Sequence, residues 1–117
     1  MYRCSSGRHV SRKSDPIQWA ETRPDDGMAI RLQSDRIGID VDDHSGKRGG
    51  ATLAEAENRW DRVPYSPRSS ARPGDPVSGI RLYRVPEGVK LRDGIEFAEL
   101  SLGGVDIIPH HHRYAMC

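Results

Sequence analysis

The stretch Gly38-Ile39-Asp40-Val41-Asp42-Asp43 ends an apolar segment with three acidic side chains. Side chains alternate across a strand, so Asp40 and Asp42 are expected to share one face, with Cα atoms about 7 Å apart. Close carboxylates repel one another unless a cation, a base or solvent relieves the repulsion. Two carboxylates on one strand face suit a hard divalent cation, which takes oxygen ligands. The alternative is that the three acids are solvated at a strand end and cap a turn.

Two well-known loop motifs do not account for this stretch. An EF-hand loop starting at Asp40 would need an oxygen ligand, a glycine and a glutamate where His44, Ser45 and Ala51 stand. A P-loop also fails, because the first glycine and the final Ser or Thr of that motif are missing.

A third carboxylate occupies a similar setting further along the chain. Asp106 lies between Val105 and Ile107, so it is expected to point away from the face of its apolar neighbours. The spacing predicts that the strands carrying Asp40 and Asp106 converge on one site.

Between these acids lies the segment Ser78-Gly79-Ile80-Arg81-Leu82-Tyr83, in which Gly79, Arg81 and Tyr83 share one predicted strand face. Glycine lets a ligand approach the backbone, and a guanidinium binds phosphate oxygens bidentately. The tyrosine ring can pack against a sugar or base. The alternative for Arg81 is a surface arginine on a strand.

These three motifs in this order resemble the catalytic core of the archaeo-eukaryotic primase superfamily. The resemblance is closer to the N-terminal domain of bifunctional DNA primase/polymerases from phages, plasmids and actinobacteria. It extends over residues 15–117, with the motifs at 38–42, 78–83 and 105–107 and an aromatic residue at Tyr114. Residues 1–14 are then expected to be a disordered basic tail.

The resemblance implies roles for individual residues. By it, the catalytic residues, which bind Mg²⁺ or Mn²⁺, are Asp40, Asp42 and Asp106. Also by resemblance, the nucleotide-binding residues are Ser78, Gly79, Arg81, Tyr83 and His112.

Two departures from the family pattern qualify these roles. Arg81 stands where the family usually has histidine, so phosphate contact is expected there and proton transfer is not. The family domain usually begins with a further strand and helix and continues into a Pro-Ser segment. We therefore expect a partial domain, incomplete at both ends.

The implied function is metal-dependent nucleotidyl transfer, with DNA primase and DNA polymerase activity in phage, plasmid or bacterial DNA replication. The implied partners are nucleoside triphosphates, a DNA template and a replicative helicase domain or protein. Two alternatives stay open. One is a truncated, non-catalytic remnant that binds nucleotide or a replication partner, and the other is a small α+β domain whose acids are structural.

The adjacent histidines His110, His111 and His112 do not by themselves predict a metal site. Neighbours on a strand point to alternating faces, so at most two of the three can converge. Within the family resemblance, His112 lies near Asp106 and is expected to touch the nucleotide.

Composition predicts one small domain. The chain has 117 residues, of which 35% are hydrophobic and 30% charged, and a net charge of +1 that favours no class of partner. Cys4 and Cys117 have neither disulfide-framework nor zinc-site spacing. No segment approaches the roughly 20 apolar residues of a membrane span, and the basic start lacks the apolar run of a signal peptide. We therefore expect a cytoplasmic protein without membrane partners.

The elements that position the motifs can be read from apolar patterns and turn residues. The expected fold is α+β, an RRM-like primase-polymerase core with a mostly antiparallel sheet and few helices. We expect strands 28–32 and 37–42 to pair as a hairpin. A capping box of Thr52 and Glu55 predicts a helix that runs to Trp60, with the Trp60 ring in the core. The remaining expectations are a helical turn at 17–21, an extended piece within 67–72, and strands at 78–85, 95–100, 105–108 and 113–116.

Overall fold

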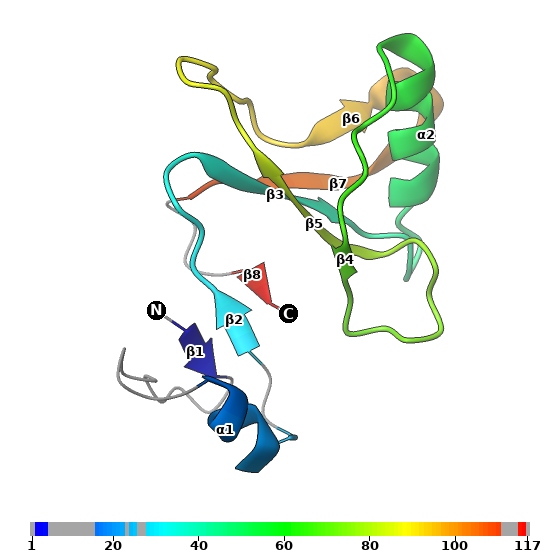
Figure 1. The fold of residues 1–117 in the computed structure, drawn as a ribbon. Helices are drawn as coiled ribbons and strands as arrows, with labels where there is room; N and C mark the ends of the chain where they lie inside the picture. The colour runs from blue at the N-terminus through cyan, green and yellow to red at the C-terminus, as the bar shows by residue number, and fades with distance from the viewer. Residues whose placement is uncertain (1, 5–15, 23, 26–27, 111–114, 117) are drawn as a thin grey trace.

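The computed structural model describes residues 2–4, 16–22, 24–25, 28–110 and 115–116, and its main feature is an antiparallel sheet of five strands. The strand order is β4-β5-β3-β7-β6 (Figure 1). The bounds are β3 (Arg36–Val41), β4 (Arg68–Ser69), β5 (Gly79–Arg84), β6 (Ile95–Phe97) and β7 (Leu102–Ile108).

A second, smaller sheet has the order β1-β2-β8, with β1 at Tyr2–Cys4, β2 at Met28–Ile30 and β8 at Ala115–Met116. The short helix α1 (Pro16–Thr22) lies at the same end of the molecule (Figure 1). In this sheet Tyr2–Cys4 pair with β2. The expectation of a disordered basic tail over 1–14 stays a prediction, since residues 1 and 5–14 lie outside the described residues.

The predicted hairpin of 28–32 with 37–42 is wrong. Both edges of β3 are occupied, one by β5 and the other by β7, so no edge is left for β2. The chain instead bends between the two sheets, with the Arg36 amide donating to the Gln33 carbonyl at 3.0 Å. The apolar strand 36–41 thus takes the central position, where an Ile- and Val-rich strand buries most surface.

Helix α2 (Gly49–Arg59) packs against one face of this sheet, over β7 and β6. Val41 and Val105 lie directly opposite each other in the β3–β7 pair and are 0% and 2% exposed. Ala56, Phe97 and Leu102 form the adjoining apolar cluster. The alternation of β3 therefore buries one set of side chains and leaves the next set on the other face.

Two predictions about α2 are wrong. The helix begins three residues before Thr52, which is buried within its first turns and donates its hydroxyl to the Gly103 carbonyl at 2.6 Å. The side chain of Thr52 therefore serves a tertiary contact and does not cap the helix. Trp60 follows the helix and is 70% exposed, touching the buried Phe97 ring only at a centroid distance of 5.8 Å.

The other expected elements are confirmed, with shifted ends. The segment 98–100, expected as strand, is a 3-10 helix, η1 (Ala98–Leu100), between β6 and β7. The α+β class and the antiparallel sheet are confirmed, and an RRM-like chain path stays a prediction. Among the described residues, no helix has the length and apolar character needed to cross a membrane.

Candidate functional site

The acidic motifs meet on the face of the sheet opposite α2. In the β3–β7 pair, Asp40 lies directly opposite Asp106. Directly opposed residues of an antiparallel pair project to the same face, with Cβ atoms about 5 Å apart. Asp42 lies two positions after Asp40 and therefore projects to the same face. The Asp42 amide donates to the Gly104 carbonyl at 2.8 Å. The predicted convergence of the two acid-bearing strands is therefore present in the fold.

Asp42 has two nitrogen-bearing partners, Lys47 and His44. Its carboxylate forms an ion pair with the Lys47 ammonium and lies 3.2 Å from the His44 Nε2. The turn that returns Lys47 to Asp42 passes through Ser45 and Gly46, whose φ angles of 54° and 84° are in the left-handed region. This turn places a positive charge beside the acids.

The third acid of the run, Asp43, has a structural role. Its Oδ1 accepts the Gly50 amide at 2.9 Å, at the start of α2, where free amides need acceptors. The Asp43 amide in turn donates to the Ser78 hydroxyl at 2.8 Å. Ser78 is only 3% exposed, so it fixes the end of β3 relative to β5.

The electrostatics of the acids differ from one another. Burial raises the pKa of Asp40, and the neighbouring Asp42 and Asp106 raise it further by repulsion. The hydrogen bond from Lys47 lowers the pKa of Asp42, with a smaller contribution from His44. The charged form of Asp40 is thus disfavoured in the folded protein, whereas that of Asp42 is favoured.

The sheet is hollowed beside Asp106. A cavity of about 450 Å³ is lined by Asp106 and by glycines of β7 and of the segment before β6, among them Gly94, Gly103 and Gly104. A Cβ on Gly94 would lie 3.2 Å from the Asp106 Oδ1, so a side chain there would crowd the carboxylate. The glycines leave Asp106 exposed and approachable.

The acids supply hard oxygen donors of the kind that Mg²⁺ and Mn²⁺ prefer. The raised pKa of Asp40 reflects burial and repulsion that a bound cation would relieve. Within the described ranges, however, no three acidic, histidine or cysteine side chains are grouped closely enough to hold one ion. Asp42 is turned toward Lys47, so the donor set fits a divalent cation only after Asp42 leaves that partner.

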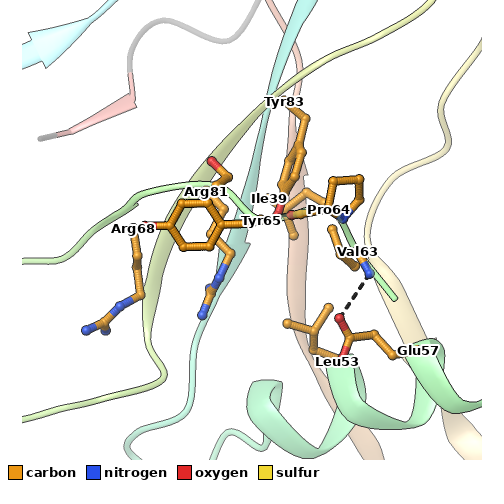
Figure 2. Close-up of a pocket in the computed structure, with 10 residues that line it drawn as sticks. Ile39, Leu53, Glu57, Val63, Pro64, Tyr65, Arg68, Arg81 and Tyr83 are labelled. Carbon is orange, nitrogen blue, oxygen red and sulfur yellow. Dashed lines mark hydrogen bonds between the residues drawn. The ribbon is translucent and has the colours of Figure 1, made fainter. Parts of the chain in front are cut away.

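The residues predicted to bind nucleotide do not gather at the acids. Arg81 lies opposite Ile39, whereas the β5 residue opposite Asp40 is Ile80. Arg81 and Tyr83 therefore project to the α2 side of the sheet, where both line a separate pocket (Figure 2). The sequence motif placed them on one strand face correctly, but the register puts that face away from the acids.

Two further predictions have specific outcomes. Gly79 has a φ of 136°, and a Cβ there would lie 2.4 Å from the Ser69 carbonyl oxygen, so the close approach of β4 requires the glycine. His111, His112 and Tyr114 lie outside the described residues, and the expected contact of His112 with nucleotide stays a prediction.

Sequence reasoning missed Lys47 and His44, and it gave capping of a turn by Asp43 only as an alternative. The signal for Lys47 was the pair Ser45-Gly46, which is typical of a tight turn and brings position 47 back toward position 42. The signal for Asp43 was weaker, because its acceptor role depends on where α2 begins.

Comparison with known proteins confirms the family resemblance. The family model described as bifunctional DNA primase/polymerase, N-terminal, matches residues 7–116. No curated protein and no solved structure gives a significant match to the chain. The family match starts eight residues before the predicted domain boundary at residue 15.

Proposed function

The chain belongs to the family of bifunctional DNA primase/polymerase N-terminal domains, and we propose that it is a metal-dependent nucleotidyltransferase with DNA primase and polymerase activity. The observation that carries the proposal is the cross-strand pair of Asp40 and Asp106, with Asp42 on the same face. The setting would be phage, plasmid or bacterial DNA replication in the cytoplasm, together with nucleoside triphosphates, a DNA template and a replicative helicase.

In this proposal Asp40, Asp42 and Asp106 would hold Mg²⁺ or Mn²⁺, and the bound ions would supply activation of a 3′-hydroxyl and neutralisation of the negative charge on the triphosphate. The chain contributes position and charge. Asp40 and Asp106 project from paired central strands, which fixes their separation better than loops would. Lys47, which pairs with Asp42, is the cation within reach of triphosphate oxygens once Asp42 turns toward the ion.

The test is incorporation of labelled nucleotide on primed and unprimed single-stranded DNA templates with Mg²⁺ or Mn²⁺. Replacing Asp40 or Asp106 by asparagine should reduce product about 100-fold or more, as removal of a charge-stabilising group at a reacting centre typically does. The matched control is Asp61→Asn, an exposed acid after α2, which should retain wild-type activity. No product from well-folded wild type, or full activity of Asp40→Asn, would refute the proposal.

A second measurement shows whether a loss of product reflects misfolding. Asp40→Asn removes a partly buried charge that its neighbours repel, so its melting temperature in EDTA should be at least that of the wild type. Mn²⁺ should raise the melting temperature of the wild type but not that of the variant.

A non-catalytic domain that binds nucleotide is the second candidate. The observation that favours it is the ion pair of Lys47 with Asp42, which already satisfies one of the three acids. Calorimetry would select this candidate if nucleotide bound in a metal-dependent manner while no incorporation occurred.

A further inference from the structure

A cleft of about 670 Å³ lies where β5 ends, between Ser34 and Asp35 on one side and the loop 85–89 on the other. The loop follows β5 and projects beyond the sheet in Figure 1. Asp35 stands just before β3 begins, whereas Asp40 and Asp42 stand at the other end of that strand. The cleft is therefore a surface separate from the acidic site.

Hydrogen bonds hold both walls of this cleft in place. The Val85 amide donates to the Asp35 carbonyl at 2.8 Å, and the Arg84 Nε donates to the Asp35 Oδ2 at 2.9 Å. The Val89 amide donates to the Pro86 carbonyl at 3.3 Å, which closes the turn of the loop. Because the walls are fixed before a ligand arrives, binding here costs little conformational entropy.

Aliphatic side chains of the loop are exposed and not packed into the core. Val89 lines the cleft and is 51% exposed, and Leu91 follows two positions later with 46% exposed. Apolar side chains that lie together on a surface are typical of an interaction site, unlike single scattered ones. A ligand that covers both side chains would gain hydrophobic free energy.

The backbone that follows the cleft is available to another chain. Residues 90–92 belong to no helix, strand or turn. Within the described part of the chain, their amides and carbonyls form no hydrogen bond. An extended segment of a partner can add to such a stretch through main-chain hydrogen bonds, while alternate side chains supply the specificity.

Two cations in this stretch have no internal partner. Lys90 and Arg92 alternate with Val89 and Leu91 along the chain. Among the described residues, neither cation has an ion pair or a side-chain hydrogen bond. In an extended backbone, residues two positions apart share a side, so the two cations lie together and repel each other. Carboxylates of a partner would relieve this repulsion.

The other end of the cleft carries a negative charge. Glu87 lines the cleft and forms no ion pair within the described ranges, whereas Asp35 is paired with Arg84. A phosphate backbone, which is anionic along its whole length, would be repelled at Glu87. The described residues that line the cleft also include no aromatic ring on which a base could stack. Charge and side-chain type therefore favour a peptide over a nucleic acid.

We propose that this cleft and the segment 89–92 form a docking site for an extended segment of a partner protein, in which aliphatic and acidic side chains alternate. The aliphatic side chains of the partner cover Val89 and Leu91, and its carboxylates pair with Lys90 and Arg92. A basic side chain of the partner is favoured at the Glu87 end. Docking leaves the acidic site open and does not depend on catalysis there.

The test selects decapeptides from a random phage-displayed library on the immobilised full chain. Counter-selection uses a triple variant that carries Lys90→Gln, Leu91→Ser and Arg92→Gln. The enriched sequences should contain aliphatic residues that alternate with aspartate or glutamate. The most enriched peptide is then labelled with fluorescein and titrated by anisotropy.

Single and double variants divide the expected contributions. Leu91→Ser should weaken binding of the peptide about 3- to 10-fold, because about half of a leucine side chain loses its burial. Lys90→Gln together with Arg92→Gln should weaken it about 2- to 20-fold, as expected for two exposed ion pairs. This second effect should vanish in about 1 M salt, which screens exposed charges.

Two matched controls lie outside the cleft. Leu100→Ser removes a leucine of nearly the same exposure as Leu91, 43%. Arg62→Gln removes an exposed arginine that, among the described residues, has no ion pair. Each control should change the affinity twofold or less. Asp40→Asn should bind the peptide as the wild type does, which separates docking from the acidic site.

The proposal is overturned if no sequence is enriched, if the enriched peptides lack acidic residues, or if they bind the triple variant as tightly as the wild type. It is also overturned if the controls weaken binding as much as Leu91→Ser does. A ten-nucleotide thymidine strand should distinguish little between wild type and triple variant. If the strand loses affinity on the triple variant as the peptide does, the segment binds nucleic acid instead. Circular dichroism checks that each variant is folded.

Discussion

Replacing Thr52 by valine tests how α2 is attached to the sheet at the acidic site. Thr52 is 0% exposed, and its hydroxyl donates to the Gly103 carbonyl at 2.6 Å and to the Arg48 carbonyl at 3.0 Å. Valine has nearly the same shape but no donor. The Arg48 carbonyl would still accept the amide of residue 52 at 3.0 Å, so only the Gly103 carbonyl loses its partner.

The expected cost follows from that one unsatisfied acceptor. Leaving a buried acceptor unpaired costs about 1–3 kcal/mol, and we expect about 1–2 kcal/mol because Gly103 is only half-buried. Urea denaturation at pH 7, followed by circular dichroism, measures the difference in the free energy of unfolding. The matched control is Thr22→Val in α1, where an exposed hydroxyl donates to the Gln18 carbonyl at 2.9 Å, with an expected change within about 0.5 kcal/mol. If both variants change stability equally, the Thr52 hydroxyl does not attach α2 to β7 as argued.

Three further predictions concern the same region. Gly49→Ala should destabilise the protein by about 3 kcal/mol, because the new Cβ would lie 2.4 Å from a carbonyl oxygen of β7, whereas Gly74→Ala, with no atom within 4 Å, should be neutral in the same urea assay. Lys47→Met should lower the melting temperature in EDTA and tighten Mn²⁺ binding in calorimetry, since Asp42 loses its internal cation; unchanged Mn²⁺ affinity would contradict this. Hydrogen bonds hold the pKa of Asp75 at about 2, below its unfolded value, so they stabilise the fold at pH 7 and this stabilisation disappears as the pH falls toward 2. Asp75→Asn should therefore melt at a lower temperature than the wild type at pH 7, and this difference should shrink at acid pH. A difference in melting temperature that stays constant with pH would contradict the prediction.

Local patterns predicted most elements of this fold but not how they pair. The Ile- and Val-rich segments 37–42 and 78–85 and the acid-centred strand around Asp106 were all predicted as strands. The hairpin of β2 with β3 was wrong because adjacency in sequence competes with long-range pairing, which no local turn residue reveals. The Trp60 prediction was wrong because the apolar stripe of α2 is completed by Phe97 from β6, leaving the indole outside.

The arrangement of the candidate site was likewise predictable from the sequence only in part. Strand alternation was sufficient to place Asp40 and Asp42 on one face. The similar setting of Asp106 between apolar residues predicted its convergence on them, from a strand that proves to be the neighbour. Alternation also grouped Arg81 with Tyr83 correctly. It could not say which face of β5 meets the acids, because that depends on register, and a shift of one residue exchanges the faces.

The structure resolves the repulsion within the acidic run by giving its members different environments. Asp43 satisfies the free amide of Gly50 at the start of α2, and Asp42 is neutralised by Lys47. Asp40 is the member that stays partly buried with its pKa raised, and it faces Asp106 on the next strand. An added cation would therefore gain most free energy between Asp40 and Asp106. Because Lys47 already supplies a charge at Asp42, in the proposed function a divalent ion would compete with Lys47 for that carboxylate, and this competition would determine how readily the three acids act together.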